Sequence, residues 1–400
     1  MEMKKDGLGR RAFLKNGLMG VAGFGALSAF PVRAQVKGQT FKEPEGQNRK
    51  GGYLYRSLGR TGITLPIVSM GVMNSDNENL IRAALDAGIV HLDTAHGYMR
   101  GRNEETIGRV IKDRARDSYF IGTKVGSESD TAAFLGKVDL SLKRLGLEYV
   151  DILYLHGLGN REAVLAEPML QALASLKKAG KIRFAGVSTH SNEHEVIRAC
   201  VESKAFEVVL AAYNFRKTNI VEFDKAAAEA AQAGVGIVAM KTMAGGYWDG
   251  RQRQQPIPAK AALKWALSNP NVTTAIPGMT AFDQLETNLQ VVKDTALTDE
   301  EKRSLKLIPE EGGLYCQGCR ECLPQCPAGL PIPDLIRSYM YAAGYRNYGE
   351  AYDLAASLGV GTSPCSSCGA CAVRCRMGFD VKARATAAAS ILNSPPELFG

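Results

Sequence analysis

The chain has 400 residues, nine of them cysteines, and a formal net charge of +8 at pH 7. With 45% hydrophobic residues it is long enough to bury one large core and to carry a smaller appended domain. Residues 1–34 contain six basic and two acidic residues, so +4 of the net charge belongs to them and the remainder is mildly basic. Nothing in this balance indicates nucleic-acid binding.

Residues 1–34 have the pattern of a twin-arginine signal peptide. Arg10 and Arg11 precede an apolar stretch from Gly17 to about Phe30, and the segment closes at Ala34. The stretch is shorter than the roughly eighteen residues that a membrane span needs. We expect the twin-arginine export machinery to deliver the folded protein to the periplasm, with no stable membrane span after cleavage. An uncleaved N-terminal anchor is the alternative.

Residues 35–52 are expected to form a linker, and residues 53–310 repeat a short apolar strand, a loop and an amphipathic helix. Eight strands are predicted near residues 67–70, 90–93, 119–123, 149–155, 182–187, 208–212, 236–240 and 272–276. Glycines such as Gly88, Gly146 and Gly180 end the intervening helices. This repeat predicts an α/β fold, a (β/α)8 TIM barrel. A doubly wound sheet is less favoured, because no G-x-G-x-x-G motif follows the first strand.

Reactive side chains follow three neighbouring strands of the predicted barrel. Asp93 ends the second strand, and Tyr98 follows five residues later. Lys124 ends the third strand and His156 ends the fourth. Active sites in this fold lie at the C-terminal ends of the strands. We therefore expect an acid, a phenol, an ammonium and an imidazole to meet at one mouth of the barrel.

The stretches 92–98, 122–124 and 154–156 resemble the catalytic blocks of the aldo-keto reductases in order and spacing. The resemblance covers roughly residues 53–307 and implies that a small-molecule carbonyl and an alcohol are interconverted. Tyr98 would be the general acid or base, although a free phenol has a pKa near 10. Lys124 would lower the pKa of Tyr98, Asp93 would orient Lys124, and His156 would polarise the substrate oxygen.

The same resemblance implies a nicotinamide cofactor, NAD(P). Its expected contacts are Ser188, Thr189, Gly278 and Asn288. However, Thr189, Leu210 and Met240 replace the asparagine, glutamine and tyrosine with which the family usually holds the nicotinamide ring. Gln284 stands where an arginine often reaches the 2′-phosphate of NADP. We therefore expect NAD(P) to be tightly bound if it is present, and its absence is the alternative.

Eight of the nine cysteines form two runs within residues 311–400. The first run is Cys316, Cys319, Cys322 and Cys326, and the second is Cys365, Cys368, Cys371 and Cys375. This spacing is typical of ligands to [4Fe-4S] clusters, whereas zinc normally uses separated C-x-x-C pairs. In the two-cluster pattern the fourth cysteine of each run binds the other run's cluster, so Cys375 joins the first run and Cys326 the second. Cys200 lies at helical spacing with Val196 and Ile197 and is expected in the core.

Two helices are predicted between the cysteine runs, at residues 331–344 and 348–358. Residues 311–400 therefore resemble an α-helical ferredoxin domain. Tyr341, Tyr345 and Tyr348 are expected to pack around the clusters. The loop at residues 244–258 follows the seventh strand and either lies over the barrel mouth or is solvated.

Together these features predict an exported iron-sulfur oxidoreductase of the aldo-keto reductase type. It would interconvert a carbonyl and an alcohol and exchange electrons with a redox partner protein through two [4Fe-4S] clusters. The alternative is an electron-transfer or partner-binding protein whose barrel has lost nicotinamide binding.

Overall fold

The computed structural model describes residues 34–36, 39–41, 48–128, 130–245, 257–306 and 316–399. The chain divides into two units, Met1–Thr40 and Phe41–Gly400. Strands β1 (Ala34–Val36) and β2 (Gln39–Phe41) form a two-stranded sheet. The signal-peptide prediction falls on residues 1–34, nearly all of which lie outside the described residues, as does most of the loop at 244–258. The barrel and the C-terminal helices belong to the unit Phe41–Gly400.

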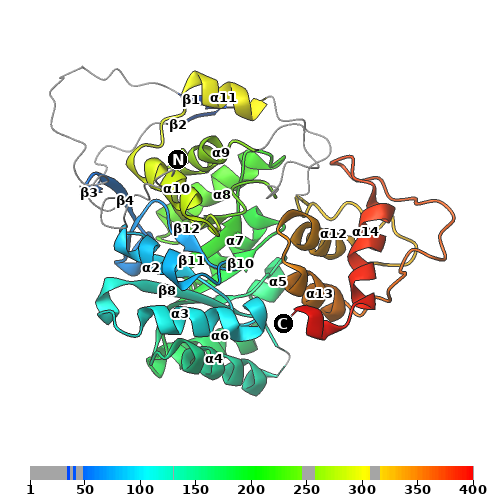
Figure 1. Ribbon diagram of the computed structural model, residues 1–400, viewed down its shortest axis with the longest axis horizontal. Coiled ribbons are helices and arrows are strands. Elements are labelled where there is room, and N and C mark those ends of the chain that lie inside the picture. The colour runs from blue at the N-terminus through cyan, green and yellow to red at the C-terminus, as the bar shows by residue number, and fades with distance from the viewer. Residues whose placement is uncertain are drawn as a thin grey trace, which may run out of the picture. The chain divides into compact units, whose positions relative to one another are not determined.

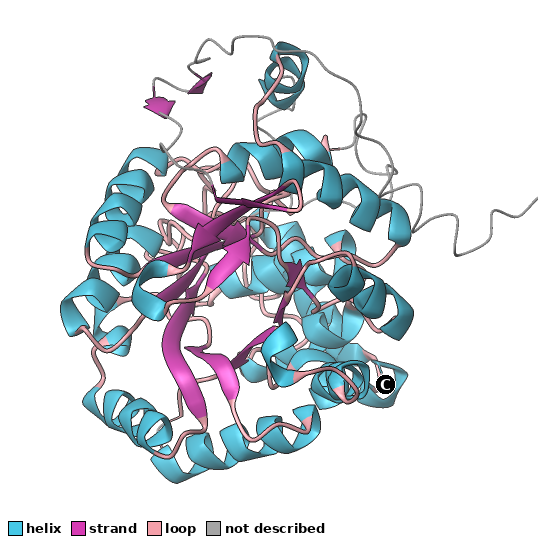
Figure 2. Cartoon of the chain, turned by 90° about the vertical axis from the view of Figure 1, so that its left-hand side faces the viewer, coloured by secondary structure: helices cyan, strands magenta, loops and turns pink. Residues whose placement is uncertain are grey.

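Eight parallel strands form the centre of this unit, and helices enclose them (Figure 2). The strands are β6 (Met70–Gly71), β7 (His91–Asp93), β8 (Phe120–Val125), β9 (Val150–Leu155), β10 (Ile182–Thr189), β11 (Val208–Ala212), β12 (Gly236–Met240) and β13 (Val272–Ala275). Each strand pairs with the next in chain order. Parallel bridges from Val68 to Ala275 and from Gly71 to Gly278 join the first strand region to the last. The predicted (β/α)8 barrel is confirmed, and the doubly wound alternative is excluded.

Helices follow the strands of the barrel, and the last two of them come after the final strand. They are α2 (Glu78–Asp86), α3 (Arg102–Ile111), α4 (Thr131–Leu145), α5 (Arg161–Val164), α6 (Glu167–Lys178), α7 (Glu193–Ser203), α8 (Ile220–Gln232), α9 (Ala259–Leu267), α10 (Phe282–Lys293) and α11 (Asp299–Lys306). Gly88, Gly146 and Gly180 follow helices with φ values of 93°, 67° and 72°, a conformation that favours glycine. Cys200 is fully buried in α7, as predicted from its spacing.

A small antiparallel sheet packs against one end of the barrel. It consists of β3 (Asn48–Lys50), β4 (Tyr53–Ser57) and β5 (Thr64–Pro66). Leu58 and Leu65 belong to the same buried cluster as Ile152 and Tyr154 of the barrel interior. The backbone N–H of Arg60 donates to the carbonyl of Gly234, just before β12 begins. This sheet therefore covers the N-terminal ends of the strands, opposite the end where Asp93, Lys124 and His156 lie.

The C-terminal segment is helical. It contains α12 (Ile332–Tyr339), which continues into a π-helical turn at Met340–Gly344, then α13 (Tyr348–Ser357) and α14 (Val381–Ser390), which lie side by side (Figure 1). The two helices predicted between the cysteine runs are confirmed, and α14 was not predicted. Apart from Val381 at its start, its buried positions are alanines, including Ala385 and Ala389, so its sequence shows little contrast between an apolar and a polar face.

The C-terminal segment is joined to the barrel at the C-terminal ends of the strands. The side chain of Asn347 donates to Asn74 Oδ1 over 2.8 Å. The guanidinium of Arg100, in the 3-10 turn Tyr98–Gly101, lies 3.3 Å from the carboxylate of Asp353. Among the described residues no helix is long and apolar enough to cross a membrane.

Candidate active site and cysteine clusters

Asp93, Lys124 and Tyr98 meet at the C-terminal ends of β7 and β8. The register places Asp93 opposite Gly122, and Lys124 lies two residues further along β8, on the same face of the strand. Lys124 Nζ lies 2.5 Å from Asp93 Oδ1, 2.6 Å from the carbonyl of Thr94 and 3.4 Å from the phenol oxygen of Tyr98. Asp93 and Lys124 are each only 2% exposed, so their ion pair is shielded from water.

Tyr98 lies between this ion pair and His156. It begins the turn Tyr98–Gly101, in which Met99 and Arg100 have φ values of 51° and 55°. The rings of Tyr98 and His156 meet edge to face with centroids 6.0 Å apart. The structure therefore brings together all four residues that follow the second, third and fourth strands.

The electrostatics of Tyr98 differ from the sequence expectation. Burial raises the pKa of Tyr98 well above its usual value of 10, and the negative charge of Asp93 adds to the effect. The sequence led us to expect a pKa lowered by Lys124, but the net shift is upward. Burial outweighs the stabilisation that Lys124, 3.4 Å from the phenol oxygen, gives to the phenolate. Tyr98 consequently keeps its proton throughout the physiological pH range.

Two histidines at the site are held neutral. Burial lowers the pKa of His156 to about 3, and the charges of Lys124, Arg337 and Lys241 act in the same direction. Burial also lowers the pKa of His190 well below its usual value of 6.5. A neutral imidazole carries one N–H, so each ring can donate a single hydrogen bond at neutral pH.

A cavity of about 310 Å³ opens beside Asp93 and Tyr98. It extends from these residues to Gly278 and Asn288, at the loop after β13 and in α10. Its wall also includes Met73, His190, Met240, Lys241, Ile276, Gln284, Tyr341 and Tyr345. Residues from both the barrel and the C-terminal segment therefore line one cavity.

The tyrosines of the C-terminal segment do not lie where the sequence suggested. Tyr341 and Tyr345 line the cavity of the barrel and pack with Met340 and Ala212, and not around the cysteines. Tyr348 is 51% exposed. The spacing of these residues predicted their helices correctly, but it gave no information on which neighbouring element each ring would meet.

The four expected NAD(P) contacts separate into two pairs. Gly278 and Asn288 line the cavity. Ser188 and Thr189 are fully buried outside its wall: the hydroxyl of Ser188 accepts from the N–H of Gly157 over 2.9 Å, and that of Thr189 donates to the carbonyl of Ser191 over 2.8 Å. Both hydroxyls are used to hold neighbouring loops. Gln284 Oε1 accepts from the N–H of Thr280 over 2.8 Å.

Three residues of the site were missed in the sequence. His190 and Lys241 line the cavity, and Glu350 lies close enough to raise the pKa of Tyr98. Lys241 directly follows β12 and His190 directly follows β10, so the rule that singled out Lys124 and His156 applied to both. Glu350 lies in α13, which reaches the site only through tertiary packing, and no local pattern could have revealed it.

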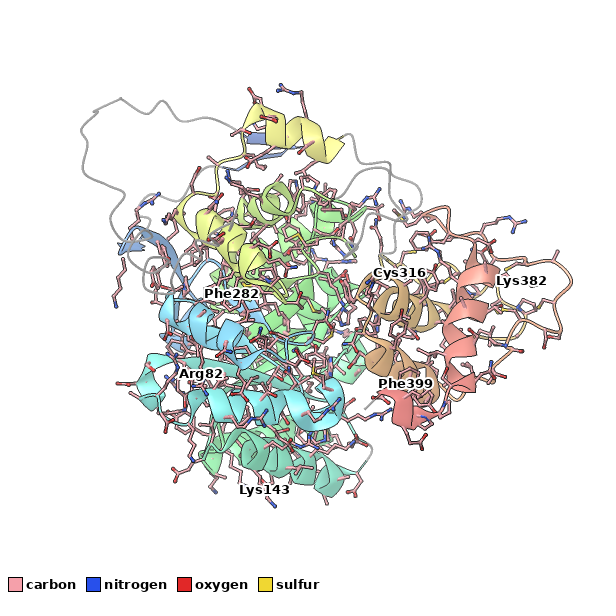
Figure 3. The ribbon with its side chains drawn as sticks, viewed as in Figure 1. Arg82, Lys143, Phe282, Cys316, Lys382 and Phe399 are labelled. Carbon is pink, nitrogen blue, oxygen red and sulfur yellow. The ribbon has the colours of Figure 1, made fainter. Side chains whose placement is uncertain are left out.

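The eight cysteines of the two runs surround two small cavities. The first cavity is lined by Cys316, Cys319, Cys322 and Cys375. The second is lined by Cys326, Cys365, Cys368 and Cys371. Figure 3 labels Cys316, at the start of the first run, and Lys382 of α14, whose ammonium donates to the carbonyl of Cys368 over 2.6 Å. The last cysteine of each run thus lies with the first three of the other run.

This arrangement fits cubane clusters. In a [4Fe-4S] cluster each thiolate binds a different iron, so the four sulfur atoms must be spread around a cavity. The donor set and its spacing around each cavity therefore suit an iron-sulfur cluster.

The first of these cavities adjoins the barrel. Gln317 Oε1 accepts from the N–H of Thr218, in the loop after β11, over 2.7 Å, and its amide group donates to the carbonyl of Arg216. Gly318 has a φ of +68°, and a Cβ there would lie 2.7 Å from the carbonyl oxygen of His190. The loop that carries Cys316 and Cys319 is thus packed directly against a residue of the large cavity.

The chain was compared with known proteins. The model of the aldo/keto reductase family matches residues 63–260 and 255–308, and the model of a 4Fe-4S dicluster domain matches residues 315–379. The L-glyceraldehyde 3-phosphate reductase of Escherichia coli O157:H7 is 27% identical over 320 residues, covering 63% of this chain and 91% of that protein. The 9,11-endoperoxide prostaglandin H2 reductase of Trypanosoma cruzi is 27% identical over 272 residues, covering 62% of this chain and 89% of that protein.

The fold is similar to that of solved reductases. The holo form of an aldo-keto reductase from Bacillus halodurans superposes with a TM-score of 0.52 and 25% identity, covering 63% of this chain and 95% of that one. A thermostable aldo-keto reductase bound to the inhibitor epalrestat gives a TM-score of 0.53 and 27% identity, covering 63% of this chain and 98% of that one. Because the family model matches more than half of the chain, the protein belongs to the aldo/keto reductase family and is an oxidoreductase with a 4Fe-4S dicluster domain.

Proposed function

We propose that the protein interconverts a small-molecule carbonyl and an alcohol at Tyr98, with electrons passed to or from two [4Fe-4S] clusters. One observation carries this proposal. The cavity lined by Asp93 and Tyr98 is also lined by Tyr341 and Tyr345, from the segment that lies between the two cysteine runs. The loop of the first run packs in turn against His190 of the same cavity. This packing supports the proposal, because clusters bound by the cysteines would lie close to a carbonyl bound beside Tyr98.

The proton chemistry is assigned to the four residues at the strand ends. Tyr98 retains its proton and would donate it to the carbonyl oxygen as negative charge develops there. The neutral ring of His156 would donate a hydrogen bond to the same oxygen. Lys124, 3.4 Å from the phenol oxygen, would stabilise the phenolate that remains. Asp93 fixes the position of Lys124 through its 2.5 Å contact.

The electron balance sets what the bound groups must supply. Reduction of a carbonyl to an alcohol consumes two electrons and two hydrogen nuclei, and Tyr98 provides the one on oxygen. When bound, the clusters would supply electrons singly, so a two-electron relay, NAD(P) or a flavin, would be needed between them and the carbonyl to deliver the electron pair with the hydrogen for carbon as a hydride. Gly278 and Asn288 are the residues that would contact NAD(P) in the cavity.

A second function is favoured by a different observation. Thr189 and Leu210 occupy the positions from which the family's asparagine and glutamine hold the carboxamide of the nicotinamide, and both are fully buried outside the cavity wall. Without these partners the nicotinamide carboxamide would lose hydrogen bonds that contribute about 0.5–1.5 kcal/mol each. The protein would then be an electron carrier whose barrel no longer binds nicotinamide.

We further propose that the protein acts in the periplasm after export by the twin-arginine route. Support comes from Arg10 and Arg11 ahead of a short apolar stretch. Export of a folded protein also allows clusters to be inserted before the thiols meet an oxidising compartment. A redox partner protein in the same compartment would exchange electrons with the clusters.

One experiment separates the two functions. The folded protein is purified anaerobically, its small molecules are released with acid, and NAD, NADP and flavin are assayed beside iron and sulfide. The oxidoreductase proposal predicts reduction of a panel of carbonyls, such as glyceraldehyde, a sugar and a quinone, by NAD(P)H or by reduced methyl viologen. Clusters without turnover of any carbonyl and without an organic cofactor would favour the carrier.

A further inference from the structure

Lys241 occupies an unusual place at the end of β12. It directly follows Met240 and has a φ of +59°, a left-handed conformation that residues other than glycine rarely adopt. The side-chain amide of the fully buried Asn214 donates to the carbonyl of Lys241 over 3.1 Å and holds this conformation. The side chain of Lys241 lines the cavity that contains Tyr98.

The ammonium of Lys241 faces two aromatic rings of the C-terminal segment. Its Nζ lies 4.7 Å from the ring centroid of Tyr341 and 5.0 Å from that of Tyr345. Such contacts attract a cation to the negative faces of the rings, but they do not neutralise its charge. The two rings are themselves 6.0 Å apart, so they form a cage on one side of the ammonium.

The other lysines in the protein interior have carboxylate partners. Lys124 pairs with Asp93, Lys217 pairs with Glu193 at 2.8 Å, and Lys264 pairs with Glu301 at 3.0 Å. In the part of the chain that the structure describes, no carboxylate lies within ion-pair distance of Lys241. This lysine therefore presents its charge to the cavity and not to a fixed acid.

The charged groups around Lys241 make this part of the cavity attractive to a negative ligand. Burial lowers the pKa of Lys241 to about 7, Arg337 and Lys124 act in the same direction, and Glu350 opposes them. Arg337 and Lys241 together also lower the pKa of His156 and of His190. Both neighbouring tyrosines have a raised pKa and stay neutral. A bound anion would offset the repulsion among the cations and restore the charge of Lys241.

We propose that Lys241, caged by Tyr341 and Tyr345, is the anion-binding subsite of this cavity and receives a carboxylate or phosphate group. This inference rests on the proposed function, because it places the anionic group on a ligand that reacts at Tyr98. The anion has two possible sources: the carbonyl substrate itself, or the phosphate of a nicotinamide nucleotide. In the first case the substrates would be small anionic carbonyl compounds, such as 2-oxo acids or phosphorylated aldehydes.

Binding is measured by anaerobic calorimetry with four probes: pyruvate, its neutral amide, inorganic phosphate and nicotinamide mononucleotide. Lys241→Met is compared with Lys178→Met, which removes the same charge from an exposed position on α6. We expect Lys241→Met to lower the affinity for the anionic probes about tenfold or more and to leave the affinity for the neutral amide unchanged. Lys178→Met should bind all four probes as the unmodified protein does.

The pH dependence adds a readout that a merely structural lysine would not give. Because the ammonium form of Lys241 is lost as pH rises through about 7, affinity for pyruvate, whose carboxylate keeps a constant charge in this range, should fall between pH 6 and pH 8. Lys241→Arg should keep its affinity over this range, since a guanidinium stays charged. Equal affinities of the unmodified protein and Lys241→Met for every anionic probe would overturn the proposal.

Competition between the probes assigns the source of the anion. Displacement of pyruvate by nicotinamide mononucleotide would place the nucleotide phosphate at Lys241, whereas simultaneous binding would assign Lys241 to the substrate. Either result supports the subsite. The assay needs no turnover, so a protein that binds anions at Lys241 but reduces no carbonyl would refute the proposed function and leave the subsite standing.

Discussion

Replacing Tyr98 with phenylalanine is expected to lower the rate of carbonyl reduction by about 10²- to 10⁴-fold, the usual contribution of a positioned general acid. The substitution removes the only acidic proton that the four strand-end residues can deliver directly to the substrate oxygen. Lys124 is bound to Asp93 and Thr94, and the neutral ring of His156 can donate a hydrogen bond but not readily a proton. The ring itself remains, so its edge-to-face contact with His156 is kept. Initial rates with reduced methyl viologen as donor measure the effect.

The matched control for this variant is Tyr348→Phe, which removes a hydroxyl from an exposed ring of the C-terminal segment. It should retain the rate of the unmodified protein. Both variants should show unchanged visible absorption of the clusters, because neither residue lines a cysteine cavity. A Tyr98→Phe protein that reduces carbonyls at half the original rate or better would remove Tyr98 from the mechanism.

Removal of one cysteine should eliminate one cluster and leave the other intact. We expect the iron content to fall from about eight to about four atoms per chain, because a cubane needs four thiolates. The structure makes this test specific to the ligand sets: Cys326 lines the cavity of the second run, and Cys375 lines that of the first. Cys326→Ala should therefore give the same residual electron paramagnetic resonance spectrum as Cys368→Ala.

A second pair of variants tests the other cluster. Cys375→Ala should give the same residual electron paramagnetic resonance spectrum as Cys319→Ala. Cys200→Ala serves as the control, because this thiol is fully buried in α7. We expect the iron content of this variant to equal that of the unmodified protein. A Cys326→Ala spectrum that matches Cys319→Ala would mean that each run binds its own cluster, contrary to the arrangement of the two cavities.

The barrel could be predicted from the sequence because its signals are local. Strands β11 and β12 were predicted at their observed bounds, and the others to within a few residues. Strand ends converge at one mouth in this fold, so the meeting of Asp93, Lys124 and His156 followed from their positions alone. The spacing of the cysteines likewise predicted which thiols surround each cavity.

What the sequence could not predict depends on packing between distant segments. The pKa of Tyr98 is governed by burial beneath a segment more than two hundred residues away, and the local ion pair of Lys124 with Asp93 does not reverse that effect. Tyr341 and Tyr345 reach the barrel cavity because α12 continues into a π-helical turn beside it, a geometry that helical spacing does not encode.

The family resemblance named four residues as contacts of NAD(P), but it did not show which of them face the cavity. Gly278 and Asn288 line the cavity, whereas Ser188 and Thr189 turn their hydroxyls toward loop backbone groups. For Lys241 the sequence showed the position but not the surroundings. Its position after β12 was visible in the sequence, but its significance depends on two tyrosines contributed by the C-terminal segment.

We propose that electrons move between the clusters and a carbonyl in the Tyr98 cavity. The most direct measurement reduces the clusters under argon, removes the excess reductant and then adds a carbonyl compound while the visible absorption of the clusters is followed. We predict that the clusters reoxidise and that one alcohol forms for every two electrons lost. Clusters that stay reduced while the same protein reduces that carbonyl with NAD(P)H would contradict the claim.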